Sequence, residues 1–100
     1  MASFTYHFNW EPAKADTNFR KHGVRFEATT AAVMDPLALS LFDADHSESE
    51  ERWVTLGQGG DRALLVVVHT FDELNSEEAV VRIVSARWAT NTERRMYEGR

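Results

Sequence analysis

Cysteine is absent from this sequence of 100 residues. Its absence excludes disulfide bonds, thiolate nucleophiles and cysteine-rich zinc sites. Long apolar runs are missing too, because the longest, residues 63–68, is far shorter than the roughly 20 residues that cross a bilayer. The first ten residues, MASFTYHFNW, contain no basic stretch followed by an apolar one, so no secretory signal is predicted. We expect one cytoplasmic domain over residues 1–100, without membrane association, since the chain is too short for two domains.

Basic residues are outnumbered by acidic ones, and the formal net charge of −5 is unusual for a protein that handles nucleic acid. The acids, however, gather in two segments that hold no lysine or arginine, residues 43–51 and 72–78. The rest of the chain is net positive, and residues 79–100 hold five arginines against two glutamates. This segregation is compatible with a local basic surface, although ordinary solvated faces would produce the same pattern.

Metal ligands and common catalytic motifs are scarce as well. No two of the four histidines have the helical spacing of a metal site, and no acidic stretch resembles a calcium loop. The glycines at positions 57–60 lack the lysine of a phosphate-binding loop, and no serine lies in a G-x-S-x-G elbow. We therefore expect neither a metal nor another cofactor.

The pattern of apolar residues predicts an α+β fold. We expect two N-terminal helices packed on a twisted antiparallel sheet of about four strands, with a C-terminal helix. Pro12 opens the first helix and Gly23 ends it in a left-handed cap. Asn91 or Thr92 is the expected cap of the last helix.

The other predicted elements follow from alternation and turn residues. A short strand at residues 4–10 precedes the first helix, and the second helix covers residues 26–34. The antiparallel meander has three or four strands, with the acidic segments as connections and a glycine turn at residues 59–61. Its predicted strands are residues 37–42, 51–58, 63–71 and 79–89.

Without these motifs, the side chains available for catalysis are lysines and arginines together with a few histidines. RNA is cleaved without a metal when its own 2′-hydroxyl attacks the adjacent phosphorus, which requires a base, an acid and cations against the phosphoryl charge. His22 and His69 are the acid–base candidates, because a free histidine titrates near pH 6.5, at about neutral pH. The candidates for charge stabilisation are Lys21, Arg52, Arg82 and Arg87.

Each candidate also has an ordinary structural interpretation. His22 precedes the cap glycine, where a cation interacts favourably with the helix dipole. His69 has the strand parity of apolar neighbours, which is typical of a hydrogen-bonded, partly buried histidine. Arg82 interrupts an apolar strand, so it either pairs with an acid or lines a cleft, and we favour the cleft. Arg87 shares a face with Ser85, and a β-bulge would bring it beside Arg82.

Four stretches of the chain carry a resemblance to a known family. They are FNWEPAKADTNFRKHGVRFEAT, DPLALSLFDADHSESEERWVTLG, LLVVVHT and RIVSARWATNTERRMYE. Over residues 8–97 the sequence resembles the BrnT toxins, whose fold is similar to that of the RelE group of RNA-cleaving toxins. The resemblance implies a ribonuclease that blocks translation. It also implies neutralisation by a BrnA-like ribbon–helix–helix antitoxin, through which the pair binds operator DNA.

The resemblance extends to site residues. The matching positions are Lys21, His22, Arg52, His69, Arg82, Arg87, Arg94 and Tyr97. Among them, Arg52, Arg94 and Tyr97 are the expected substrate-binding residues. The leading hypothesis is a metal-independent endoribonuclease. One alternative is a non-catalytic BrnT-like module that serves only as antitoxin partner and corepressor, and another is a structural partner domain with no nucleic-acid role.

Overall fold

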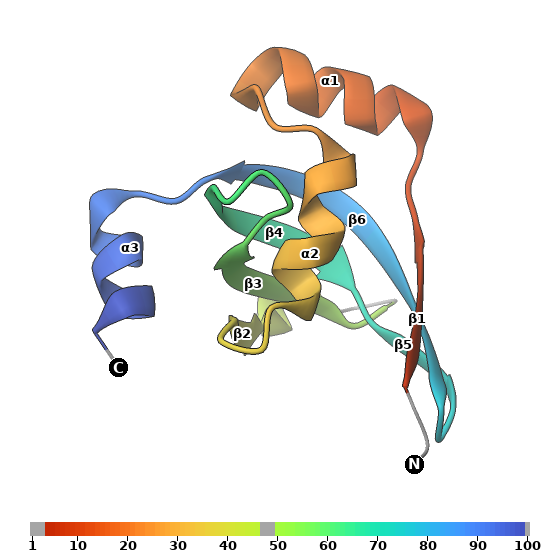
Figure 1. Ribbon diagram of the computed structural model, residues 1–100. Helices are drawn as coiled ribbons and strands as arrows, with labels where there is room; N and C mark the ends of the chain where they lie inside the picture. The colour runs from red at the N-terminus through yellow and green to blue at the C-terminus, as the bar shows by residue number, and fades with distance from the viewer. Residues whose placement is uncertain (1–3, 47–49, 100) are drawn as a thin grey trace.

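A mixed β-sheet organises the chain. The computed structural model describes residues 4–46 and 50–99, and within them six strands follow the order β1-β6-β4-β3-β2, with β5 also paired to β6 (Figure 1). The strands are β1 (Thr5–Asn9), β2 (Leu39–Phe42), β3 (Arg52–Gln58), β4 (Leu64–Thr70), β5 (Asp72–Asn75) and β6 (Glu78–Trp88). The helices are α1 (Pro12–His22), α2 (Thr29–Met34) and α3 (Asn91–Glu98), and short 3₁₀ turns cover Phe26–Ala28 and Ala44–His46.

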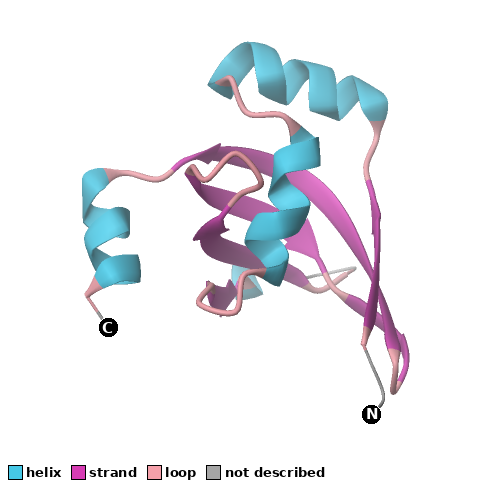
Figure 2. Ribbon diagram, viewed as in Figure 1, coloured by secondary structure: helices cyan, strands magenta, loops and turns pink. Residues whose placement is uncertain are grey.

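The expectation of an antiparallel sheet of about four strands was wrong in two respects. The first strand, β1, joins the sheet and pairs with β6 in parallel, so the sheet is mixed (Figure 2). The acidic segment 72–78, expected as a connection, forms β5 and its hairpin turn into β6. All four residues of β5 are exposed, so their charges stay in water while the backbone still pairs. No helix in the described part of the chain is long and apolar enough to cross a membrane.

The helix ends match the sequence in part. Gly23 ends α1 with a left-handed φ of 72°, and its N–H donates to the carbonyl of Phe19 at 2.8 Å, as predicted. The predicted second helix is divided, because the Thr29 hydroxyl bonds back to the carbonyl of Phe26 and the first turn is 3₁₀. Thr90, rather than Asn91 or Thr92, caps α3: its side chain accepts from the Glu93 N–H in a reciprocal capping box.

Two apolar clusters lie on opposite faces of the sheet. On one face, α2 packs on β3 and β4. Its buried cluster is Val24, Phe26, Ala32, Leu65, Val67, Val81, Ile83 and Ala86. On the other face, Tyr97 of α3 packs on a smaller cluster of Leu56, Leu64 and Val66. The sheet is thus only partly covered on its second face, which we call the open face.

The placement of α1 also differs from the expectation that both N-terminal helices pack on the sheet. It lies against β6, at the edge of the sheet, above the point where β1 ends (Figure 1). The Asn18 side chain accepts from the Ala86 N–H at 3.0 Å and donates to the Ala86 carbonyl at 2.9 Å. β1 pairs only with the first part of β6, so the backbone at Ala86 has no neighbouring strand on that edge. The Asn18 amide makes the two hydrogen bonds that a strand would make there.

Candidate functional site

A β-bulge in β6 determines which side chains reach the open face. Ser85 lies opposite Val68 and Ile83 opposite His69, so Val84 is the extra residue. Because side chains alternate along a strand, the extra residue puts Arg82 and Arg87 on the same face although they are an odd number of residues apart. The predicted bulge is confirmed, but the two arginines are four steps apart along β4, roughly 13 Å at about 3.3 Å per residue.

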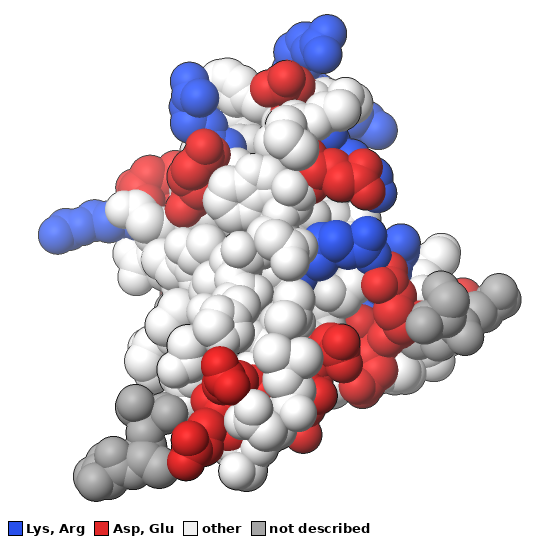
Figure 3. Space-filling model, turned by 90° about the vertical axis from the view of Figure 1, so that its right-hand side faces the viewer, with Lys and Arg blue, Asp and Glu red and all other residues white. Residues whose placement is uncertain are grey.

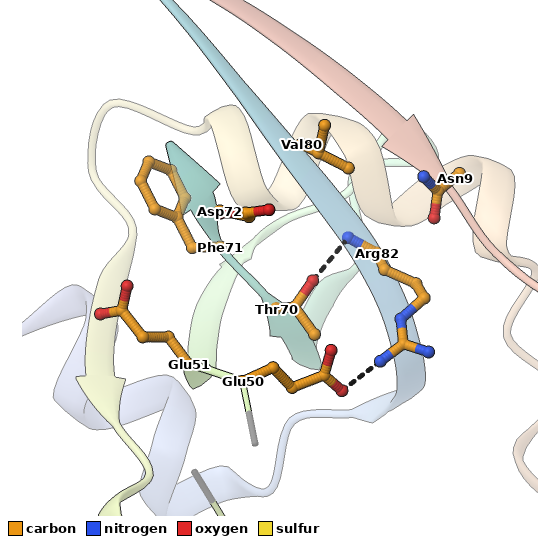
Figure 4. A pocket seen from close by; sticks show the side chains of 8 residues that line it. All are labelled: Asn9, Glu50, Glu51, Thr70, Phe71, Asp72, Val80 and Arg82. Carbon is orange, nitrogen blue, oxygen red and sulfur yellow. Dashed lines mark hydrogen bonds and ion pairs between the residues drawn. The ribbon is translucent and has the colours of Figure 1, made fainter. Parts of the chain in front are cut away.

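A cleft of about 350 Å³ lies at the Arg82 end of the open face (Figure 4). It is lined by Asn9, Glu50, Glu51, Thr70, Phe71, Asp72, Val80 and Arg82. The Arg82 backbone N–H donates to the Thr70 hydroxyl at 3.0 Å, which holds β6 against the end of β4. The Arg82 guanidinium donates to the Glu50 carboxylate. Arg82 therefore satisfies both interpretations of the sequence, since it lines a cleft and is paired with an acid.

Glu50 lies between two arginines. Its Oε1 atom pairs with Nη2 of Arg82 and is 4.0 Å from Nη2 of Arg52. All three side chains are about one-third exposed, so the arrangement opens to solvent. The carboxylate oxygen occupies a place where two guanidinium groups converge on one anion, which is the arrangement that also binds a phosphoryl oxygen.

Arg87 is occupied by a different acid. Its Nη1 and Nη2 donate to the two carboxylate oxygens of Glu93, both at 2.9 Å. These bonds, with the backbone N–H of Thr90, lower the pKa of Glu93 to about 2. The bidentate pair fastens the start of α3 to β6. Arg87 and Arg82 therefore belong to separate parts of the open face.

His69 lies on the other face, beneath α2. It is 4% exposed, and its Nδ1–H donates to the Thr70 carbonyl at 2.9 Å. Its Nε2 accordingly accepts from the Thr55 hydroxyl at 2.7 Å, and Thr55 accepts in turn from Ser40 at 2.7 Å. Burial lowers the pKa of His69, against a smaller raising effect of the bond to Thr70. The imidazole is neutral and fully hydrogen-bonded, and it points away from the arginines.

The depressed pKa of His69 predicts acid sensitivity of the fold. The unfolded chain binds this proton more readily than the folded one, so stability is lost as pH falls below the unfolded value of about 6.5. Between pH 7 and pH 5 we expect the wild type to lose more free energy of unfolding than His69→Gln, by at most about 1.4 kcal/mol per pH unit. Urea titrations at both pH values measure the difference. Parallel losses in the two proteins would show that His69 does not titrate across unfolding.

Lys21 and His22 lie at the margin of the open face. With Val84 and Ser85 they line a cavity of about 320 Å³ between the end of α1 and β6. His22 is half-buried and Lys21 is exposed. This cavity and the Arg82 cleft have no lining residue in common, so Lys21 and His22 are not among the residues that line the cleft.

A comparison with protein families decides the identity of the chain. A family model described as "Ribonuclease toxin, BrnT, of type II toxin-antitoxin system" matches residues 10–93. The chain belongs to the BrnT family. A search of curated proteins found no matching relative. A type II toxin acts together with an antitoxin, so membership of this family implies both an RNA substrate and an antitoxin partner. The resemblance predicted from the sequence is confirmed.

The last two predicted site residues lie on α3 of this BrnT chain, outside the Arg82 cleft. The Tyr97 hydroxyl donates to Asp35 Oδ2 at 2.5 Å, and the same oxygen accepts from the Gln58 N–H at 2.9 Å. Tyr97 thus ties α3 to the end of α2 and of β3. Arg94 is exposed, and within the described residues its side chain makes no hydrogen bond or ion pair.

Sequence reasoning on this BrnT chain missed Glu50, which was counted only as part of the acidic segment 43–51. Residues 47–49 of that segment lie outside the described residues. A signal was present, because Glu50 is two residues before Arg52 and alternate residues of an extended chain share a face. Thr70 and Asn9 of the cleft carried no comparable signal, since their position depends on how β4 and β1 meet β6.

Proposed function

We propose that this BrnT chain is a metal-independent endoribonuclease and that the Arg82 cleft binds the scissile phosphate. The observation that supports this most is the Glu50 carboxylate, held by Arg82 and facing Arg52, because the same guanidinium groups would stabilise the charge of a phosphoryl group. The 2′-oxygen attacks the phosphorus, the bond from phosphorus to the 5′-oxygen breaks, and the products are a 2′,3′-cyclic phosphate and a 5′-hydroxyl.

The remaining candidates take roles according to their place. Arg87 is roughly 13 Å from Arg82 along the sheet, whereas one phosphate with its two hydrogen-bond layers spans only about 8 Å. Arg87 therefore contacts a neighbouring phosphate of the RNA. Lys21 and Arg94 contribute positive charge along the RNA path. His22, which lines the cavity beside Ser85, is the general acid for the departing 5′-oxygen. His69 is a structural residue in this proposal, because its two ring nitrogens are used inside the core.

RNA cleavage in the presence of EDTA tests this function. We expect the purified chain to cleave RNA in chelator at an unchanged rate, because the chemistry needs only a base, an acid and cations. Among residues 4–46 and 50–99 no three histidine, aspartate or glutamate side chains are arranged to hold a metal ion. Products should carry 2′,3′-cyclic phosphate ends. Activity that vanishes with EDTA and returns with magnesium would contradict the mechanism.

The partner in this proposal is a BrnA-like ribbon–helix–helix antitoxin. On the side of the molecule shown in Figure 3, the lower half carries acidic side chains without lysines or arginines, whereas the upper half carries both kinds. An acidic surface repels RNA and attracts a basic protein. The antitoxin covers the cleft, ends the inhibition of translation, and carries the toxin to operator DNA.

One observation favours the second candidate, a non-catalytic module that acts only as antitoxin partner and corepressor. The chain's own acids engage both Arg82 and Arg87, which reduces the charge available to RNA. Measuring antitoxin binding and RNA cleavage on the same preparation distinguishes the two candidate functions. A chain that binds its antitoxin but leaves RNA intact with and without magnesium is the binding module.

A further inference from the structure

Glu50 is the acid that contacts Arg82, and neither the sequence motifs nor the family description gives it a role. We propose that Glu50 is the general base that takes the proton from the attacking 2′-hydroxyl. This inference rests on the proposed ribonuclease function and deepens it, because it adds a base to a site so far defined by cations.

The hydrogen bonding of Arg82 allows the base and the substrate to be present together. A guanidinium has five N–H donors in a planar fork. Glu50 engages only Nη2, and within the described residues the other donors of this side chain contact no acceptor. Arg82 can therefore hold a phosphoryl oxygen on a second edge while it keeps Glu50. The carboxylate then lies within one guanidinium width of the phosphorus, where the neighbouring 2′-hydroxyl of the nucleotide would be.

The direction of the side chains distinguishes Glu50 from its neighbours. In Figure 4 the Glu50 carboxyl group points to Arg82, whereas the Glu51 side chain extends away from it. Asp72, at the start of β5, also lines the cleft but has no ion pair with Arg82. The Glu50 side chain is 37% exposed, so a proton it has taken can pass to solvent.

The step balances with the residues already assigned. Glu50 takes the 2′-hydroxyl proton while the oxygen electron pair forms the new bond to phosphorus. The bond between phosphorus and the 5′-oxygen breaks, and the 5′-oxygen receives a proton from His22. Glu50 then releases its proton to water and His22 regains one, which restores the starting state.

An alternative role for the same contact is competition. Glu50 would then only occupy the phosphate position of the free protein, and RNA would displace it. The two roles predict opposite effects of one substitution, Glu50→Gln, which removes the charge but keeps the shape. Loss of a base lowers the cleavage rate, whereas loss of a competitor raises RNA affinity and leaves the rate unchanged or higher.

Single-turnover cleavage of a mixed-sequence RNA oligonucleotide pool at saturating protein tests the proposal. For Glu50→Gln we expect a rate lower by about 10²–10⁴-fold and loss of the acid limb of the pH–rate profile. Glu50→Asp, which keeps a carboxylate, should recover part of the rate. Asp45→Asn is the matched control, because it makes the same charge change at an exposed position of the same segment. Melting temperature and affinity for 2′-O-methyl RNA, which cannot be cleaved, should be retained by all variants.

The outcomes separate this inference from the proposed function. If the wild type cleaves and Glu50→Gln cleaves equally well or faster, Glu50 is a competitor and not the base, and the ribonuclease function stands. If Glu50→Gln loses activity together with melting temperature or 2′-O-methyl RNA binding, its role is structural and the proposal is wrong. If the wild type itself cleaves no RNA under any metal condition, both the function and the base assignment fail.

Discussion

Replacing Arg82 with alanine should lower RNA cleavage by roughly 10²–10³-fold, the usual effect of removing one donor to a transition-state oxyanion. The side chain lines the cleft and its guanidinium contacts an acid rather than core residues. Its contribution to stability is small, because ion pairs that are partly solvated contribute about 0–1 kcal/mol. We therefore expect the melting temperature to change little. Single-turnover kinetics and thermal melting of the same preparation measure the two effects.

Two further variants define what Arg82 supplies. Arg82→Lys keeps the charge but loses the planar fork, so it should recover only part of the cleavage rate. Arg20→Ala removes one positive charge from an exposed position on α1 and should cleave as the wild type does. A variant Arg82→Ala with full activity and a much lower melting temperature would identify Arg82 as a structural ion-pair residue. That result would move the phosphate site elsewhere on the open face.

The local elements of the fold were predictable because their signals are local. Pro12 and Gly23 bound α1 through their own backbone preferences. The strands β3 and β6, with polar residues among apolar ones, and the almost wholly apolar strand β4 follow directly from the sequence. The pairing of β1 with β6 was not predictable in this way, because it joins segments more than 70 residues apart. The strand β5 was missed because its residues are all exposed and charged or polar apart from Leu74.

The candidate site was predictable at the level of single residues but not of their arrangement. The apolar strand around Arg82 indicated a cleft or an acid partner, and the structure contains both. His69 and Arg82 were both candidates for catalysis, yet their side chains lie on opposite faces of the sheet. His69 is paired with Ile83, and successive side chains of a strand point to opposite faces, so Arg82, the next residue, faces the other way. Glu50 and Arg82 are 32 residues apart, so only the paired strands bring them together.

Gly57 is the position where one added methyl group should most damage the fold. It is buried in β3, where the backbone of α2 crosses the sheet. A Cβ atom built on Gly57 would lie 2.2 Å from the carbonyl oxygen of Ala32 and 3.0 Å from its carbonyl carbon. These are backbone atoms of a six-residue helix, so no change of rotamer relieves the contact. A glycine inside a strand is typical of such a close approach between two backbones.

We expect Gly57→Ala to destabilise the protein by about 3 kcal/mol, at the upper end of the cost of overpacking a core. For a domain of this size that corresponds to a decrease in melting temperature of roughly 12–24 °C. Gly60→Ala is the matched control, because its Cβ would lie 4.0 Å from the nearest atom, in ordinary contact. A melting temperature of Gly57→Ala close to that of Gly60→Ala would show that α2 moves away from β3 without loss. Since α2 covers the face opposite the arginines, cleavage by the folded Gly57→Ala protein, measured well below its melting temperature, should stay near the wild-type rate.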